Sequence, residues 1–333
     1  MVGDGEPRPG EVLAERWIVE RVIGRGGMGT VVAARDVRMH ERVALKLMHA
    51  HELKNGVAVE RFFREARAAL RLQTPHVTRM REVDRLPDGR PYMVMELLEG
   101  DDLARVLKQR GALPVTEAAR YVQQAAAACA VAHAAGVVHR DLKPSNLFLA
   151  TSAGAPPCIK LLDFGISKLS GLRGTVGHAL TADGDLTGSP LYMPPEQLRA
   201  RDVDGRADVW ALGATLYELL TARRPFQADS MMAECNRILV EAPAPPSSLR
   251  SGVPAGLDRV VLRCLEKDAA RRFQSAAELE AALAPFAATP RASGRGAVVA
   301  VLVLLAALAA GSVYAVRRLA PHTAAPPASA APP

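Results

Sequence analysis

The hydrophobic pattern of the chain changes near Leu98, and this change restricts the possible folds more than any other feature. Before Leu98, short β-branched or apolar segments are separated by turn residues, which is typical of strands. After it, apolar residues recur at helical spacing over longer segments. The strand-like segments are RWIVERVIG, TVVAARDV, RVALKLM and YMVMELL, and the clearest helical ones are TEAARYVQQAAAACAVAHAAG and DVWALGATLYELL. The pattern predicts an α+β fold with two lobes, a small β-rich lobe over residues 17–98 and a larger helical lobe over residues 99–286. A cleft between two such lobes is a common place for a ligand.

One helix is expected inside the β-rich part. In VERFFREARAALRL, helical spacing places Phe62, Ala66, Ala69 and Leu70 on one face. Glu65 falls on the same face. This carboxylate therefore either points inward toward a cation or pairs on the surface with Arg61, four residues earlier.

Composition argues against several classes of protein. The chain has 333 residues, of which 49% are hydrophobic, so most of it is able to bury a core. The net charge of +7 is not gathered into a run of lysine and arginine, and no nucleic-acid partner is expected. The cysteines Cys129, Cys158, Cys235 and Cys264 form no C-x-x-C pair. Their spacing argues against zinc ribbons and disulfide frameworks and fits a reducing compartment.

The two ends of the chain differ from its middle. Residues 1–16 are rich in Gly and Pro and are expected to be flexible, and without an apolar run they predict no secretory signal. Residues 287–295 form a linker, and residues 296–316 are uncharged and mostly apolar. A helix of that length spans about 30 Å, the thickness of a bilayer core. We expect a transmembrane helix at 296–316, the alternative being a buried core helix, followed by a disordered Pro/Ala-rich tail at 317–333.

A glycine-rich segment near the N-terminus indicates a phosphate-binding loop. Gly24, Gly26 and Gly29 form G-x-G-x-x-G, which Val31 extends to G-x-G-x-x-G-x-V. Glycines let backbone N–H groups approach phosphate oxygens closely. A dinucleotide-binding fold requires a helix directly after the glycines, whereas TVVAARD is strand-like. We therefore expect a hairpin tip that closes over a nucleotide, the alternative being a flexible turn with no ligand.

Lys46 lies in the apolar strand that follows. A lysine in such a strand needs an anion beside it, because burying an unpaired ammonium group is costly. Glu65 is the candidate partner. The alternative is that Lys46 lies on an edge strand and extends its ammonium group into solvent.

Two further polar segments complete a candidate site. His139-Arg140-Asp141-Leu142-Lys143-Pro144-Ser145-Asn146 follows a predicted helix, and Asp163-Phe164-Gly165 follows the apolar strand CIKLL. Taken singly, each segment also fits an ordinary turn. Together, and in this order, the segments resemble the signature set of the eukaryotic-like (Hanks-type) serine/threonine protein kinases over residues 17–286. The G-G-M-G tip and the C-terminal apolar segment resemble the bacterial, membrane-anchored branch of that family.

The resemblance implies a bilobal protein-kinase fold and a role for each polar residue. Asp141 would orient the substrate hydroxyl and accept its proton, and Lys143 would neutralise the transferred phosphate. Asn146 and Asp163 would bind Mg²⁺, for which Mn²⁺ can substitute. Lys46, positioned by Glu65, would bind the α- and β-phosphates of ATP.

The resemblance also implies where ATP binds. Met95 would be the gatekeeper, and the carbonyl of Glu96 and the amide of Leu98 would face the adenine, with Ala44 packed on the ring. The full set of implied ATP-binding residues is Ile23, Gly24, Arg25, Gly26, Gly27, Met28, Gly29, Thr30, Val31, Ala44, Lys46, Met95, Glu96 and Leu98.

The long segment between Gly165 and Pro195 resembles an activation loop, because so long a structureless segment in a compact domain is usually functional. A phosphorylated Thr175, Thr181 or Thr187 would pair with Arg140. Ser189 would contact the acceptor residue of the substrate. Three further residues would be structural: Glu196 would pair with Arg272, and Asp208 is expected either to cap its helix or to hydrogen-bond the loop 139–146.

The resemblance predicts a serine/threonine protein kinase that transfers the γ-phosphate of ATP to proteins and to its own activation loop, in membrane-linked signalling. Protein substrates, and a second copy of the chain that it modifies in trans, are the expected partners. We expect a single-pass membrane protein with a cytoplasmic kinase domain and a short tail outside. The alternative is a nucleotide-binding scaffold without activity, which the presence of Lys46, Asp141 and Asp163 disfavours.

Overall fold

The computed structural model describes residues 6–27, 29–152, 154–163 and 190–288. The chain divides into a unit over Met1–Ala287 and a second unit over Ala288–Pro333, and the helices and strands of the described residues belong to the first. Among the described residues, no helix is both long and apolar enough to cross a membrane. The predicted membrane segment 296–316 lies outside the described residues.

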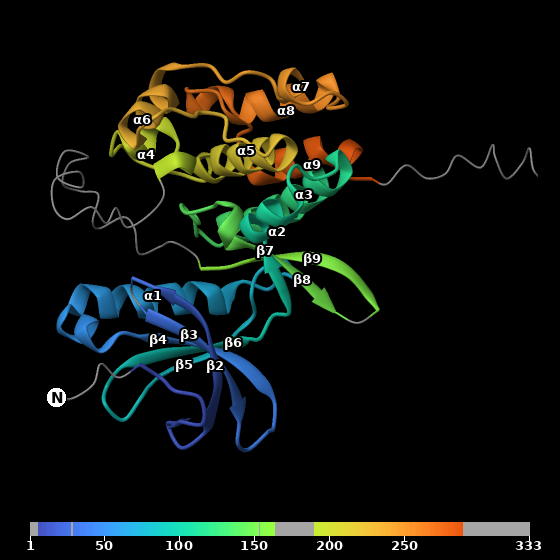
Figure 1. The fold of residues 1–333 in the computed structure, drawn as a ribbon. Coiled ribbons are helices and arrows are strands. Elements are labelled where there is room, and N and C mark those ends of the chain that lie inside the picture. The colour runs from blue at the N-terminus through green and yellow to red at the C-terminus, as the bar shows by residue number, and fades with distance from the viewer. Residues whose placement is uncertain (1–5, 28, 153, 164–189, 289–333) are drawn as a thin grey trace, which may run out of the picture. The chain divides into compact units, whose positions relative to one another are not determined.

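The small lobe is built on an antiparallel sheet with the strand order β1-β2-β3-β4-β6-β5, drawn in blue to teal in Figure 1. Its strands are β1 (Val12–Leu13), β2 (Trp17–Gly26), β3 (Gly29–Asp36), β4 (Arg42–Met48), β5 (Met80–Arg85) and β6 (Pro91–Glu96). Trp17, Val32, Leu45 and Val94 form the centre of its core. The predicted strands thus form one sheet, because their alternating apolar residues share a buried face.

The described part of the N-terminal segment, residues 6–16, is more ordered than its composition indicated. Residues 1–16 were expected to be flexible, but Val12–Leu13 pairs with Ile18 and Trp17 of β2, and Pro7 is buried. The sheet therefore begins before Trp17. A two-residue strand carries no periodicity that sequence analysis could detect.

Helix α1 (Gly56–Arg71) lies beside this sheet after the short helix η1 (Ala50–Lys54) (Figure 1). It begins where the side chain of Asn55 accepts a hydrogen bond from the N–H of Ala58, an N-cap that satisfies one free donor of the first turn. Phe62 and Ala66 pack against the sheet residues Met48 and Met93. Leu70, predicted on the same face, is instead 41% exposed.

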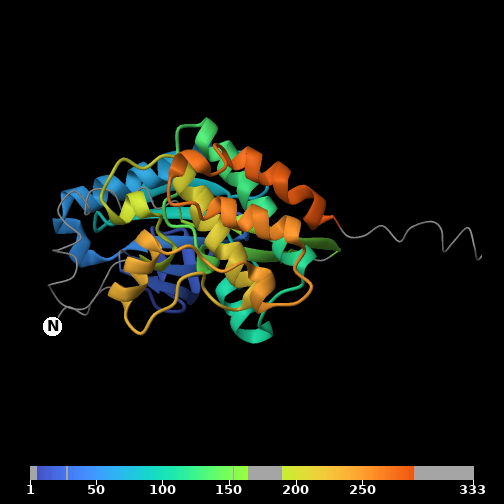
Figure 2. The same ribbon diagram turned by 90° about the horizontal axis from the view of Figure 1, so that it is seen from above.

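The larger lobe consists mainly of helices. They are α2 (Leu103–Arg110), α3 (Val115–Ala134), α4 (Pro195–Leu198), α5 (Arg206–Thr221), α6 (Met231–Val240), α7 (Pro246–Leu249), α8 (Ala255–Cys264) and α9 (Ala276–Ala287). The short helices η2 (Pro144–Asn146), η4 (Pro190–Tyr192) and η5 (Ala269–Arg271) connect them. Helix α3 packs against α5 and α9, and Figure 2 shows the orange-red α9 beside the green α3.

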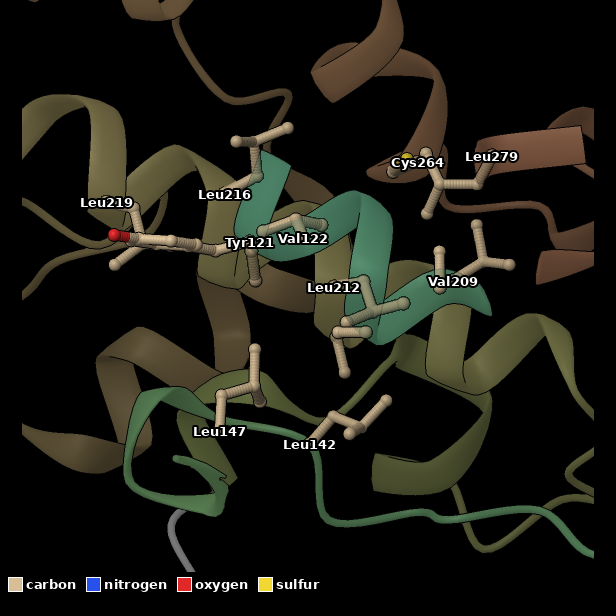
Figure 3. Packing of buried hydrophobic residues seen from close by; sticks show 14 of the residues in the cluster. Tyr121, Val122, Leu142, Leu147, Val209, Leu212, Leu216, Leu219, Cys264 and Leu279 are labelled. Atoms are coloured by element: carbon tan, nitrogen blue, oxygen red, sulfur yellow. The ribbon is translucent and has the colours of Figure 1, made fainter. Parts of the chain in front are cut away.

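The core of the larger lobe also holds the polar loop 139–146 in place. Helix α5 is buried along nearly its whole length, which explains why DVWALGATLYELL is apolar on all sides. Leu142 lies within the loop and Leu147 directly follows it, and both are almost fully buried. Both side chains point into the same cluster as Leu212 and Val122 (Figure 3). The loop is therefore anchored in the core by Leu142 and by Leu147, which directly follows it.

A small antiparallel sheet with the order β7-β8-β9 flanks this loop. Its strands are β7 (Gly100–Asp102), β8 (Leu147–Ser152) and β9 (Ala155–Leu161). Strand β8 begins directly after Asn146, and β9 ends two residues before Asp163. The sheet thus brings the two polar segments of the candidate site to neighbouring positions.

Candidate active site

Lys46 lies between two carboxylates that come from distant parts of the chain. Its Nζ donates to Glu65 Oε1 of α1 at 2.7 Å and to Asp163 Oδ1 at 2.8 Å. The side chains of Lys46 and Glu65 are 14% and 9% exposed, and that of Asp163 is 53% exposed. Glu65 therefore points inward to Lys46, and the alternative pair with Arg61 is not formed.

These charges shift one another's pKa values. Burial alone would lower the pKa of Lys46, but the charges of Asp163 and Glu65 outweigh burial and raise it. The charge of Lys46 lowers the pKa of Asp163. Burial raises the pKa of Glu65, against the opposing charge of Lys46. Lys46 thus stays protonated in the folded chain and Asp163 stays ionised.

Asp141, Lys143 and Asn146 meet at the other polar segment. Asn146 Nδ2 donates to the Asp141 carbonyl oxygen at 2.7 Å and to Asp141 Oδ2 at 3.0 Å. Lys143 Nζ is 3.3 Å from the same Oδ2. The amide nitrogen of Asn146 is directed at Asp141, which leaves its oxygen for another ligand. All three side chains come from one turn, so their spacing is set locally.

Asp208 anchors the loop 139–146 through hydrogen bonds to its backbone. Its Oδ1 accepts from the N–H of Arg140 at 2.8 Å, and its Oδ2 accepts from the N–H of His139 at 2.9 Å. Nε2 of His133, on α3, lies 2.7 Å from the same Oδ2. Asp208 is 1% exposed. The N-cap of α5 is Gly205, so of the two predicted roles the structure shows the hydrogen bonds to the loop.

His139 links the loop to the segment before Asp163, a contact that sequence analysis did not identify. Its Nδ1 accepts from the N–H of Asp141 at 3.3 Å, and Nε2 lies 2.9 Å from the carbonyl oxygen of Leu162. The two contacts fit the tautomer that carries its proton on Nε2. A fully buried imidazole therefore ties the backbone of Asp141 to that of Leu162.

Two residues of the site have left-handed backbone conformations that are unfavourable for residues other than glycine. Arg140 has φ of 64° and Asp163 has φ of 40°. Such strain costs about 1–3 kcal/mol per residue and is retained where the surroundings hold the residue in place. Arg140 directly precedes Asp141, and Asp163 follows the end of β9 by two residues. Both strained residues therefore belong to the candidate site.

The glycine-rich segment forms the tip of the β2–β3 hairpin. Gly24 pairs with Val31, Arg25 with Thr30, and Gly26 with Gly29. A strand follows the glycines, so the dinucleotide-binding alternative does not apply. A Cβ atom on Gly29 would lie 2.1 Å from the carbonyl oxygen of Leu47, whereas one on Gly24 would meet nothing closer than 3.9 Å. The fold requires glycine at 29, and Gly24 has room for a ligand to approach.

The predicted adenine site lies where β4 and β6 pair. Met95 is opposite Ala44, and Ala44 is buried. Behind Met95, a cavity is lined by Glu65, Met93 and Asp163, among others. Of the other predicted ATP-binding residues, Ile23 and Val31 lie on the β2–β3 hairpin, which pairs with β4 in the same sheet, and Thr30 is buried. Glu96 and Leu98 follow at the end of β6, and Met28 lies outside the described residues.

Glu196 and Arg272 form a bidentate ion pair inside the larger lobe. Nη1 donates to Oε1 at 2.7 Å and Nη2 to Oε2 at 2.8 Å. The Arg272 side chain is fully buried and Glu196 is 17% exposed. Arg272 also donates to the carbonyl oxygen of Glu266 at 2.8 Å. The pair joins α4 to the segment before α9 and lies outside the candidate site.

The predicted regulatory residues are only partly described. Arg140 Nη2 donates to the carbonyl oxygen of Val203 at 3.2 Å, and its Nε is buried without a partner among the described residues. Thr175, Thr181, Thr187 and Ser189 lie outside the described residues.

The oxygen donors of the site suit a hard divalent ion. Asp163 supplies a half-exposed carboxylate and Asn146 an amide oxygen. Mg²⁺ is commonly held by one or two such protein oxygens together with substrate phosphates and water. Within the described ranges, no group of three or more His, Cys, Asp or Glu side chains is placed to hold a metal ion. The oxygens of Asp163 and Asn146 therefore fit a Mg²⁺ that arrives with a nucleotide.

Known proteins similar to this chain bear on the interpretation of this site. The family model described as the protein kinase domain matches residues 17–282. The chain is 37% identical over 282 residues to the serine/threonine-protein kinase pkn3 of Myxococcus xanthus. The aligned region covers 84% of this chain and 51% of that protein. It is 35% identical over 274 residues to the serine/threonine-protein kinase PknB of Mycobacterium tuberculosis, covering 81% of this chain and 43% of PknB. The chain thus spans about half the length of these relatives, or less.

Solved structures agree with the sequence matches. The crystal structure of the Mycobacterium tuberculosis PknI kinase domain superimposes with a TM-score of 0.65 at 27% identity, covering 84% of this chain and 99% of that one. The two-lobed fold, the order of the polar segments and these matches agree with one another. The chain belongs to the protein kinase family, among the bacterial serine/threonine kinases of the Hanks type.

Proposed function

We propose that this chain transfers the γ-phosphate of ATP to serine and threonine hydroxyls of proteins. The observation that carries the proposal is the position of Lys46, hydrogen-bonded to both Glu65 and Asp163. Phosphoryl transfer depends on positioning and charge neutralisation more than on covalent chemistry. Lys46 is held between the two lobes next to the half-exposed carboxylate of Asp163. It therefore supplies both positioning and charge neutralisation.

The residues divide the reaction between them. Lys46, held by Glu65, binds the α- and β-phosphates, and the backbone of the hairpin tip covers them. Asn146 and Asp163 would hold Mg²⁺, which would supply positive charge to neutralise the phosphates. Asp141 orients the acceptor hydroxyl and takes up its proton. Lys143, 3.3 Å from Asp141, places a positive charge where the transferred group passes.

The likeness to serine/threonine-protein kinases supports a protein as the acceptor. A small hollow lies beside Asp141, lined by Leu142, Tyr192, Met193 and Pro194 and by the polar residues Arg140 and Gln197, among others. Asp141 thus lies at a surface that the hydroxyl of a substrate protein is able to approach.

Autophosphorylation of the segment 166–189 is the proposed means of activation. Arg140, whose Nε is buried without a partner among the described residues, is the cation that a phosphate on Thr175, Thr181 or Thr187 would contact. Such a phosphate would place its charge beside Arg140, whose backbone is strained. Transfer from a second copy of the chain, as a dimer, would supply it.

Membrane attachment through residues 296–316 completes the proposal. Its support is the uncharged, mostly apolar sequence of that segment, which is long enough to cross a bilayer. The ATP chemistry places the kinase domain on the cytoplasmic side, with residues 317–333 outside. Flotation of the chain with phospholipid vesicles tests this: the full chain should float and a chain ending at residue 290 should sink.

The proposed activity is tested by incubating the full chain with a general protein substrate, labelled ATP and Mg²⁺. Label should appear on serine and threonine of the substrate, and a chelator should abolish it. ATP binding without any label transfer, to the substrate or to the chain itself, would instead indicate a nucleotide-binding scaffold.

A further inference from the structure

The carboxylate of Glu96 receives two hydrogen bonds that the proposed mechanism does not use. Its Oε1 accepts from Lys160 Nζ at 2.6 Å and from the backbone N–H of Arg79 at 2.7 Å. Glu96 ends β6, Lys160 lies in β9, and Arg79 lies in the connection between α1 and β5. One oxygen atom therefore joins three segments that are distant in sequence.

This contact is partly shielded from water. The side chain of Lys160 is 16% exposed and that of Glu96 is 26% exposed. Hydrogen bonds between charged groups are roughly twice as strong as neutral ones, and partial burial reduces the screening that weakens surface ion pairs. The pair should therefore contribute measurably to local geometry, unlike the exposed pairs elsewhere on the chain.

Backbone hydrogen bonds surround the ion pair and extend it toward the metal-binding end of β9. The N–H of Glu96 donates to the carbonyl oxygen of Arg79 at 3.0 Å. Leu161, next to Lys160, receives the N–H and the Oγ1 of Thr78 at 3.1 and 3.0 Å and donates to the carbonyl oxygen of His76 at 2.8 Å. Residues 76–79 thus lie between the end of β6 and the end of β9.

The geometry points to Lys160 and the Glu96 carboxylate as positioning residues for nucleotide binding. This inference rests on the proposed function, in which the backbone of Glu96 and Leu98 faces the adenine. Neither side chain is assigned a contact with ATP. Instead, Lys160 fixes the conformation at the end of β6 from a strand that ends near Asp163. The adenine-binding backbone at the end of β6 is thereby held in place by β9 and by the segment before β5.

The effect should fall on the adenine and not on the phosphates. Lys46 and the hairpin tip are on other strands, so they keep their geometry when Lys160 is removed. Losing the ion pair should weaken ATP binding and leave turnover at saturating ATP unchanged, the pattern of a lost interaction that ground state and transition state share. Inorganic tripolyphosphate carries the phosphates without the base. Its affinity for the chain should therefore not change when the ion pair is lost.

The test compares full-length Lys160→Met with Lys160→Arg, Glu96→Gln and the control Lys108→Met, which removes an exposed lysine of α2. The Kd for ATP, the inhibition constant of tripolyphosphate, kcat and the Tm without ligand are measured for each. Lys160→Met should raise the Kd for ATP about tenfold, with tripolyphosphate, kcat and Tm close to the control. Lys160→Arg should restore most of the affinity, and the double variant Glu96→Gln/Lys160→Met should bind no more weakly than Lys160→Met.

The outcomes separate this inference from the proposed function. If the unaltered chain binds ATP and Lys160→Met binds it as tightly as Lys108→Met does, the positioning role is wrong and the kinase proposal stands. If Lys160→Met weakens ATP and tripolyphosphate equally, the residue acts on the whole site and the inference is also wrong. If the unaltered chain binds no ATP, the proposed function fails and this inference fails with it.

Discussion

Lys46 and Asp163 are joined by a 2.8 Å ion pair although 117 positions separate them in the sequence. Lys46 comes from the centre of the small lobe's sheet and Asp163 from the end of the strand segment in the larger lobe. Glu65 contacts the lysine from a third direction. This arrangement explains why a lysine is tolerated in an apolar strand, since its charge is balanced where the two lobes meet.

Replacing Lys46 should make stability depend on pH in a defined direction. In Lys46→Met, burial and the charge of Asp163 both raise the pKa of Glu65 above its ordinary value of 4.5, with no opposing cation. The folded state then binds more protons than the unfolded state above about pH 4.5, so stability falls as pH rises through that window. The free energy of unfolding, measured by urea denaturation, should differ between the unaltered chain and Lys46→Met by more at about pH 7.5 than at about pH 5. A difference that stays constant with pH, as expected for Lys108→Met, would contradict the assigned charges.

Asp208 should be needed for turnover more than for nucleotide binding. In Asp208→Asn, one of the two oxygens that accept from the loop becomes an amide donor, so a buried N–H loses its partner. The free energy of unfolding should fall by about 2–3 kcal/mol. Displacement of Asp141 should reduce kcat about a hundredfold, with the Kd for ATP nearly unchanged. Asp229→Asn, at an exposed position, is the matched control, and equal kcat values for the two variants would show that the loop does not depend on Asp208.

Two glycines of the hairpin should respond differently to alanine. Gly29→Ala places a Cβ 2.1 Å from a backbone oxygen, so the hairpin must shift, and the unfolding free energy should fall by about 1–3 kcal/mol. Gly24→Ala meets nothing closer than 3.9 Å and should keep the stability of the unaltered chain while weakening ATP binding. Calorimetric titration with ATP, together with thermal unfolding, distinguishes the two effects. Unchanged ATP affinity in Gly24→Ala would argue against close approach of the nucleotide to this strand.

The pair Glu196–Arg272 should affect stability strongly and nucleotide binding little. Arg272→Met leaves a mostly buried carboxylate without its partner and should lower the unfolding free energy by about 3 kcal/mol. Arg272→Lys should recover only part of the loss, because an ammonium group does not form the bidentate contact. Glu196→Gln/Arg272→Met should be less unstable than the sum of the single variants. Strict additivity in urea denaturation would show that the two residues do not stabilise each other.

Much of the fold follows from periodicity, and the places where prediction failed have physical causes. The strands of the small lobe and the helices α1, α3 and α5 lie close to their predicted segments because apolar spacing reports a buried face. Leu70 was placed on the wrong face, since it follows Ala69 by one residue and so lies about 100° around the helix. Strand β7, with its sequence Gly-Asp-Asp, has no apolar alternation and exists only because β8 pairs with it.

The contacts of the candidate site were also predictable only in part. Glu65 was identifiable as the partner of Lys46 because its helical face could be predicted. The contact of Lys46 with Asp163 depends on tertiary structure, and the sequence did not predict it. The contacts of the His139 imidazole and of the Glu96 carboxylate with Lys160 left no signal in residue spacing, because each joins segments that are distant in the chain.

The most direct test of the central claim is the intact mass of the full chain after incubation with ATP and Mg²⁺, beside Asp141→Asn treated identically. The account predicts that the unaltered chain gains mass in whole multiples of one phosphoryl group, on serine or threonine, and that Asp141→Asn gains none while still binding ATP. Equal phosphorylation of both chains would show that Asp141 is not the residue on which transfer depends and would contradict the account.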